Sequence, residues 1–168
     1  MYDELTEIDI QKMREEIDHR VRVLRPKLIE DVQAARAFGD LSENYEYKVA
    51  KQEKNRNESR IRYLERMIRT AKVIAPQSRG EGVVGLFDQV TVYNEKLGRE
   101  MTFRIVTTLR QDTGKGLISK ESPVGRALLG KKVGDRALIR VSDDFQYYME
   151  IRAVEKGKDD PAMAISSY

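Results

Sequence analysis

The feature that most constrains this chain is a long stretch, residues 8–75, that contains a single proline, Pro26, and a single glycine, Gly39. In its second half, side chains recur at alternating steps of three and four residues. The members of this series are Tyr47, Ala50, Lys54, Asn57, Ile61, Leu64, Ile68 and Ala71. The heptad spacing predicts a helix with a narrow apolar seam, in which the polar members Lys54 and Asn57 weaken packing but can fix the register.

The first half of the stretch carries a second seam, also at steps of three or four residues. Its members are Ile10, Met13, Ile17, Val21, Leu24, Leu28, Val32 and Ala35. Pro26 lacks a backbone N–H and predicts a kink if the helix runs through it. Two narrow seams joined by a short turn bury each other most simply as an antiparallel helical hairpin. A helix of about 30 residues is roughly 45 Å long, so we expect a thin rod with residues 39–44, GDLSEN, at its tip.

After Pro76 the pattern changes to that of short strands. Alternating or β-branched runs occur at 83–85, 90–93, 101–106, 137–141 and 147–151, separated by Gly, Asn and Asp. Between them, Ser122 suits a helix N-cap, Pro123 a first helical position and Gly130 an exit. These signals predict a small α+β domain with a mostly antiparallel sheet and one short helix.

The sequence therefore predicts a two-domain α+β protein. Residues 1–76 are assigned to the hairpin, 77–82 to a linker of turn-forming residues, 83–155 to the α+β domain and 156–168 to a flexible tail.

Composition restricts the chemistry available to the chain. With no cysteine among its 168 residues, disulfides, thiolate nucleophiles and cysteine-based zinc sites are excluded, and a reducing compartment fits. The 31 basic and 28 acidic residues give a net charge of +3, which does not by itself indicate nucleic-acid binding. The acidic N-terminus does not resemble a signal peptide, and no apolar run approaches a membrane span. We expect a soluble, cytoplasmic protein.

Asp40 and Glu43 lie at the expected tip and allow two interpretations. The spacing Asp-x-x-Glu is typical of a capping box, in which the two carboxylates bond the first backbone N–H groups of a helix. Alternatively, the carboxylates could bind Mg²⁺. Because Mg²⁺ prefers six ligands, two carboxylates would form an incomplete site that a partner must complete. The two interpretations are compatible.

The tip resembles that of the Gre transcript-cleavage factors of bacterial RNA polymerase. The similar residues are Arg36, Gly39, Asp40, Leu41, Ser42, Glu43, Asn44, Glu46, Tyr47, Ala50, Lys51, Arg60 and Ile61. Residues 118–119, 122–130 and 133–135 are similar to the C-terminal domain of the same family. The resemblance covers roughly residues 8–155, and both motifs occur in the family's order.

The resemblance implies an accessory protein rather than an enzyme. The hairpin would enter the secondary channel of RNA polymerase, and an FKBP-like C-terminal domain would dock on the channel rim. There Asp40 and Glu43 would help to hold a Mg²⁺ ion, shared with the polymerase, during cleavage of the backtracked nascent RNA 3′ end. Such chemistry fits two-metal phosphodiester hydrolysis. The isolated chain, expected to be a monomer, would bind no cofactor tightly.

The resemblance also implies roles for neighbouring residues. Arg36 and Lys51 match basic positions that could contact RNA phosphates, although either could be a solvated helix charge. Asn44 would orient the turn, and Tyr47 would pack beneath the tip. Ser122 and Pro123 match a loop in the polymerase-docking surface, and they are also expected to cap the short helix.

Three other functions remain to be separated from cleavage. A channel-binding regulator would lack the cleavage activity, and Tyr45, which replaces an alanine common among relatives, could alter the fit in the channel. An FKBP-like prolyl isomerase or chaperone would need an aromatic-lined apolar pocket. A plain coiled-coil scaffold would use the acidic tip only as a cap.

The sequence also departs from the family pattern in the C-terminal domain, where residues 142–145 replace the family's usual Pro-x-Gly turn.

Overall fold

The computed structural model describes residues 3–39, 44–76 and 79–167. The chain divides into two compact units. The hairpin unit contains residues 10–71, and the sheet unit contains residues 3–9 and the chain from Lys72 onwards. The predicted hairpin domain, residues 1–76, thus includes two short segments, 3–9 and 72–76, that cluster with the C-terminal unit.

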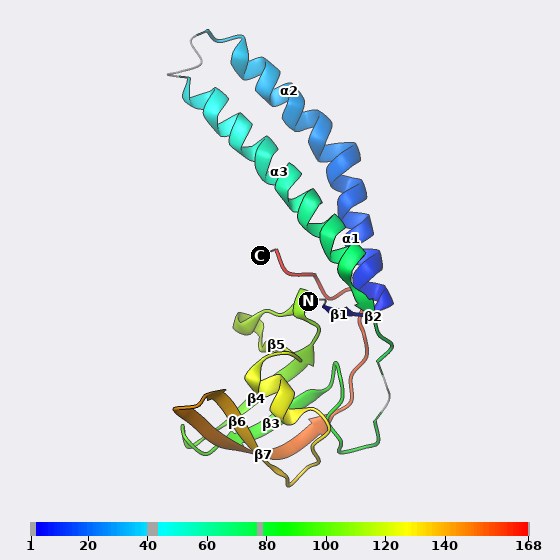
Figure 1. Ribbon diagram of the computed structural model, residues 1–168, viewed down its shortest axis with the longest axis vertical. Coiled ribbons are helices and arrows are strands. Elements are labelled where there is room, and N and C mark those ends of the chain that lie inside the picture. Colours follow the sequence, from blue (N-terminus) through cyan, green and yellow to red (C-terminus); the bar gives the residue numbers. More distant parts are fainter. Residues whose placement is uncertain (1–2, 40–43, 77–78, 168) are drawn as a thin grey trace. The chain divides into compact units, whose positions relative to one another are not determined.

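The hairpin unit is built from helices that run antiparallel to each other (Figure 1). In chain order they are α1 (Glu7–His19), the π-helical segment η1 (Arg20–Leu24), α2 (Arg25–Arg36) and, after the tip, α3 (Tyr45–Thr70). Every member of the two seams is buried or half-buried. The predicted helical hairpin is confirmed.

A kink was predicted at Pro26, and the first arm contains the π-helical segment η1 directly before it. The Arg25 N–H donates to the Arg20 carbonyl, five residues back rather than four, and Pro26 then occupies the first turn of α2. Seven seam steps take 35 − 10 = 25 residues on the first arm and 71 − 47 = 24 on the second. The wider π turn absorbs the surplus residue of the first arm.

A polar network crosses the seam beside this segment. The Asn57 amide accepts a hydrogen bond from Arg20 Nη1 at 2.9 Å and donates to the Arg20 carbonyl at 3.3 Å. The Glu16 carboxylate accepts a hydrogen bond from Arg60 Nε at 2.7 Å and one from Arg20 Nε at 2.8 Å. Burial alone would raise the pKa of Glu16, but the hydrogen bonds from Arg60 and Arg20 outweigh burial and lower it. The buried Asn57 is therefore satisfied, as a polar seam position must be.

The sheet unit contains a five-stranded sheet with the strand order β5-β4-β3-β7-β6. Its strands are β3 (Gln89–Asn94), β4 (Arg99–Val106), β5 (Leu117–Ser119), β6 (Arg136–Ser142) and β7 (Phe145–Glu155), with helix α4 at Pro123–Leu128 and 3₁₀ turns at Thr108–Arg110 and Thr113–Lys115. Neighbouring strands are antiparallel except β4 and β5, which are parallel. The predicted α+β class with a mostly antiparallel sheet is confirmed.

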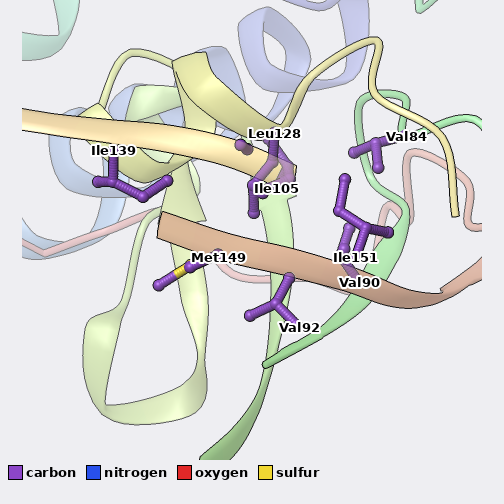
Figure 2. Close-up of a cluster of buried hydrophobic side chains, with 9 residues drawn as sticks. Val84, Val90, Val92, Ile105, Leu128, Ile139, Met149 and Ile151 are labelled. Carbon is purple, nitrogen blue, oxygen red and sulfur yellow. The ribbon is translucent and has the colours of Figure 1, made fainter. Parts of the chain in front are cut away.

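The core of this unit lies between α4 and one face of the sheet. Its fully buried side chains alternate along the strands, as a half-covered sheet requires; they include Val84, Val90, Val92, Ile105, Leu128, Ile139, Met149 and Ile151 (Figure 2). Partly buried strand residues, among them Met101, Phe103 and Val154, also pack against this core.

Two details of the predicted sheet were wrong. Residues 83–85 form no strand, since Val83 makes only an isolated bridge with Lys132. The parallel strand β5 was not predicted, because three residues are too few to show a period of two. The turn at residues 142–145 joins β6 and β7 directly, with Ser142 opposite Phe145.

Residues 156–167 pack against the sheet unit, which argues against the predicted flexible tail. The Gly157 N–H donates to Asp88 at 2.9 Å, and Asp159 pairs with the buried Arg110 at 2.6 Å. Further on, the Ser166 N–H donates to the Leu109 carbonyl at 2.6 Å. These contacts could not be predicted from the sequence, because they are made mostly by backbone groups and by charged residues that follow no periodic pattern.

The start of α1 is fixed within the same unit. Thr6 and Asp9 form a reciprocal capping box, with N–H to oxygen distances of 3.0 and 3.3 Å. Asp9 also accepts a hydrogen bond from Arg110 at 2.7 Å, and both side chains are fully buried. Strand β1 (Glu4–Leu5) pairs in parallel with β2 (Lys72–Val73). None of the helices that the structure describes is long and apolar enough to cross a membrane.

Candidate functional site at the hairpin tip

The two carboxylates singled out in the sequence, Asp40 and Glu43, lie outside the described residues. The structure does describe the two ends that flank them. Helix α2 ends at Arg36, and Gly39 follows with a φ of +106°, a backbone conformation that favours glycine. Helix α3 begins at Tyr45.

Asn44 caps the second arm of the hairpin. Its side-chain oxygen accepts a hydrogen bond from the Tyr47 N–H at 3.0 Å, and its amide nitrogen donates to the Ala35 carbonyl of α2 at 2.7 Å. One side chain thus satisfies a donor at the start of α3 and an acceptor near the end of α2. It also ties the two arms together at the tip.

The capping-box interpretation of Asp40 and Glu43 is therefore wrong for α3. A capping box would require Asp40 at the N-cap and Glu43 at the third helical position, whereas α3 starts two residues after Glu43 with Asn44 as its cap. The carboxylates precede the helix that they were expected to cap. The metal interpretation stays a prediction, because both carboxylates lie outside the described residues.

The donor chemistry of the pair suits Mg²⁺ but does not complete a site. Carboxylate oxygens are the ligands that Mg²⁺ takes from proteins, and it usually takes only one or two of them. Within residues 3–39, 44–76 and 79–167, no group of three or more histidine, aspartate or glutamate side chains is placed to hold a metal ion.

Basic side chains gather around Tyr47 on α3. The Arg36 guanidinium lies over the Tyr47 ring, 5.7 Å from its centroid. A hydrogen bond from Arg36 is the largest cause of a lowered pKa of the Tyr47 hydroxyl, and the charges of Lys51 and Lys54 lower it further. Arg36 and Lys51 are both exposed. Together these residues form a basic face of the tip, defined as Arg36, Tyr47, Lys51 and Lys54.

Ser122 and Pro123 lie in the sheet unit, at the start of α4. The Ser122 hydroxyl accepts from the Gly125 N–H at 3.0 Å and donates to the Ser119 carbonyl at 2.7 Å, so its hydrogen bonds close locally. A Cβ on Gly125 would stand 2.2 Å from the same carbonyl, so the loop needs glycine there. Pro123 occupies the first helical position and is exposed. Of the two side chains, that of Pro123 is the more exposed.

Sequence reasoning missed some features of the tip. The cap was assigned to Asp40 because Asp-x-x-Glu is a strong pattern, although Asn44 stands directly before the helical period and is also a preferred N-cap. Phe38, Tyr45 and Val49 lie off the predicted seam and were not considered together. Their grouping depends on how the two arms are aligned.

The fold is that of a two-unit protein in which a helical hairpin carries polar and charged residues to its tip. Two protein-family models match the amino-acid sequence of this chain. The model described as "Transcription elongation factor, N-terminal" matches residues 4–73, and "Transcription elongation factor, GreA/GreB, C-term" matches residues 79–156.

Individual relatives agree with this assignment. Transcription elongation factor GreA of Mesoplasma florum is 40% identical over 153 residues, covering 89% of this chain and 96% of the relative. GreA of Thermoanaerobacter pseudethanolicus is 42% identical over 137 residues, covering 82% and 87%. The chain therefore belongs to the GreA/GreB family of transcription elongation factors.

Solved structures of related proteins were also found. GreA factor homolog 1 (Gfh1) of Thermus thermophilus is 24% identical with a TM-score of 0.39, covering 93% of this chain and all of the other. GreA/GreB from Nitrosomonas europaea is 20% identical with a TM-score of 0.40, covering 93% and 99%. Membership of the family rests on the family models and the sequence relatives.

Proposed function

We propose that this factor binds the secondary channel of RNA polymerase through its hairpin and stimulates cleavage of the backtracked nascent RNA 3′ end. The observation that carries the proposal is the cap on α3. Because Asn44 is the N-cap of α3, neither Asp40 nor Glu43 is the N-cap residue of that helix. Two carboxylates three residues apart in the tip segment of a family member fit ligands for a shared metal ion.

In this proposal Asp40 and Glu43 hold a Mg²⁺ ion jointly with the polymerase. When bound, the ion would supply activated water and stabilise charge on the scissile phosphate. The chain itself contributes positioning. The bond from Asn44 to the Ala35 carbonyl fixes the two arms at the base of the loop that contains both carboxylates. The factor would work in the cytoplasm as a monomer and would not be an enzyme alone.

The basic face would contact the RNA. Arg36 and Lys51 are exposed, carry the positive charge that phosphates attract and lie on the two arms that flank the tip. Stacking on Tyr47 holds the Arg36 guanidinium, which reduces the entropy lost when it binds a phosphate. The contact would not depend on RNA sequence and would weaken with salt. Pro123 would contact the channel rim, with Ser122 shaping the loop.

A channel-binding regulator without cleavage activity is the second candidate. It is favoured by the exposure of Phe38 and Tyr45, two bulky residues that flank the tip segment in the sequence. A prolyl isomerase or chaperone is disfavoured, because Ile105, Leu128 and Ile139 fill the space between α4 and the sheet where an aromatic-lined pocket would be needed.

Transcript cleavage on a stalled, backtracked elongation complex with Mg²⁺ tests the proposal. Wild type should shorten the RNA, whereas Asp40→Ala/Glu43→Ala should bind polymerase with unchanged affinity and leave the RNA intact. The matched control is Asp143→Ala/Asp144→Ala, two carboxylates in the turn between β6 and β7 of the sheet unit. If wild type binds polymerase without stimulating cleavage, the regulator is the correct function.

A further inference from the structure

A groove runs between α2 and α3 on the hairpin, close to the tip. It has a volume of about 410 Å³. Leu28, Ala34 and Ala35 of α2 and Ala50 of α3 contribute to its lining. The lining extends from Leu28 to Phe38 on the first arm and from Tyr45 to Glu53 on the second, so the groove follows the direction of the hairpin arms.

Large apolar side chains stand along this groove and face solvent. Phe38 is 75% exposed, Tyr45 77% and Val49 38%. Single exposed apolar residues are ordinary, but three that line one concave surface indicate a site for a partner. Burying them against a partner would remove apolar surface from water, which favours association.

The charged residues of the groove all have the same sign. Asp31, Glu46 and Glu53 line it, and no basic side chain does. Glu53 is paired with Arg56 of its own helix. Among the residues that the structure describes, Asp31 and Glu46 take part in no ion pair. The groove therefore combines apolar side chains with two carboxylates, Asp31 and Glu46, that are in no ion pair among the described residues, and this complements a basic, amphipathic partner.

We propose that this groove binds a basic amphipathic helix that belongs to the polymerase. The inference rests on the proposed function, which places the hairpin tip in the polymerase channel. On α3 the lining runs from Tyr45 to Glu53, eight helical steps or roughly 12 Å, enough for about two helical turns. A helix laid along it would bury apolar residues at every third or fourth position and direct its Lys or Arg side chains to the acidic residues.

Two other occupants fit the groove poorly. RNA would bring its phosphates against Asp31, Glu46 and Glu53, and its electrostatic attraction is toward the basic face instead. A second copy of the chain, paired through the same surface by two-fold symmetry, would bring two acidic sets together. The tip thus has a basic face for RNA and an acidic, apolar groove for protein.

The first test is affinity for the RNA polymerase of the same organism in a backtracked elongation complex. Phe38→Ser/Val49→Ser should weaken binding about tenfold or more, equivalent to at least about 1.4 kcal/mol. Asp31→Lys/Glu53→Lys should weaken it too. The matched control is Val23→Ser/Ile29→Ser, since these apolar residues are exposed on the first arm but do not line the groove. Circular dichroism should show the same helicity for all variants.

The second test places a photo-crosslinking amino acid at Val49 in the same complex. Mass spectrometry should identify a helical polymerase segment flanked by Lys or Arg. Crosslinks to RNA or to a second copy, or unchanged affinity of both groove variants, would overturn the inference while leaving the cleavage assay free to support the proposed function. If wild type does not bind polymerase, the proposed function fails and the assigned partner fails with it.

Discussion

The two units of this chain reach a fixed structure by different means. The sheet unit surrounds a core of fully buried aliphatic side chains, whereas the hairpin interrupts its apolar seam with Asn57 and has the ion pair of Arg60 and Glu16 beside it. A sheet with a helix on one face buries whole side chains, but two helices alone share only a narrow seam. The sheet unit therefore depends on packing, and the hairpin depends on packing together with directed polar contacts that set its register.

The largest expected effect lies in the sheet unit. Ile139→Ala would remove part of a fully buried side chain and leave a cavity, which should lower the free energy of unfolding by about 2–5 kcal/mol. Urea unfolding followed by near-ultraviolet circular dichroism measures it. The control is Val141→Ala on the same strand, where the side chain is half exposed. Equal losses from both variants would show that the core does not dominate this unit.

The seam network should have the next largest effect. Arg60→Ala would leave the partly buried Glu16 with one cation, Arg20, and should cost about 1–3 kcal/mol. Thermal unfolding of the hairpin signal at 222 nm is the measurement. Arg56→Ala, an exposed arginine on the same helix, is the matched control. A loss no larger than the control's would mean that apolar packing alone holds the arms.

The cap at the tip should have a smaller, local effect. Asn44→Ala removes the bonds to the Tyr47 N–H and the Ala35 carbonyl, which should cost about 0.5–2 kcal/mol. Hydrogen exchange should accelerate in the first turn of α3 and remain unchanged beyond Ile61. Asn55→Ala, on the exposed face of α3, should change neither region. Uniform acceleration along α3 would contradict a local role.

The smallest expected effect is on the response to acid. The pKa of Glu16 is lower in the folded chain than its usual value of 4.5, so the unfolded chain takes up the proton first as the pH falls. Its contribution is complete above about pH 4.5 and is lost as the pH drops through the folded-state value. Hairpin Tm should therefore fall over this range in wild type, and less in Glu16→Gln. Parallel pH profiles would rule out this linkage.

Much of this structure could be predicted from the sequence because the signals were periodic. The two seams specify the hairpin, and Ser122-Pro123 with Gly130 specifies α4. Features without a period were not predictable in the same way. The N-cap of α3 is Asn44, although the Asp-x-x-Glu spacing had pointed to Asp40. The contacts of Arg110 with Asp9 and Asp159 join positions far apart in the chain. The groove could not be predicted either, because it depends on how α2 and α3 are aligned. The spacing of apolar residues within one helix does not specify that alignment.

The π-helical segment makes the first arm tolerant of losing one residue at that point. Deleting one residue within 20–24 would let the first arm continue as a regular α-helix, and the later residues of α2 would keep their faces because the π turn already absorbs one surplus residue. The same deletion within the regular part of α2 would instead turn every later residue by about 100° around the axis and move Ala35 away from α3. Among related sequences, loss of one residue from this segment would therefore preserve the surface at the tip, whereas a loss a few residues further on would change it.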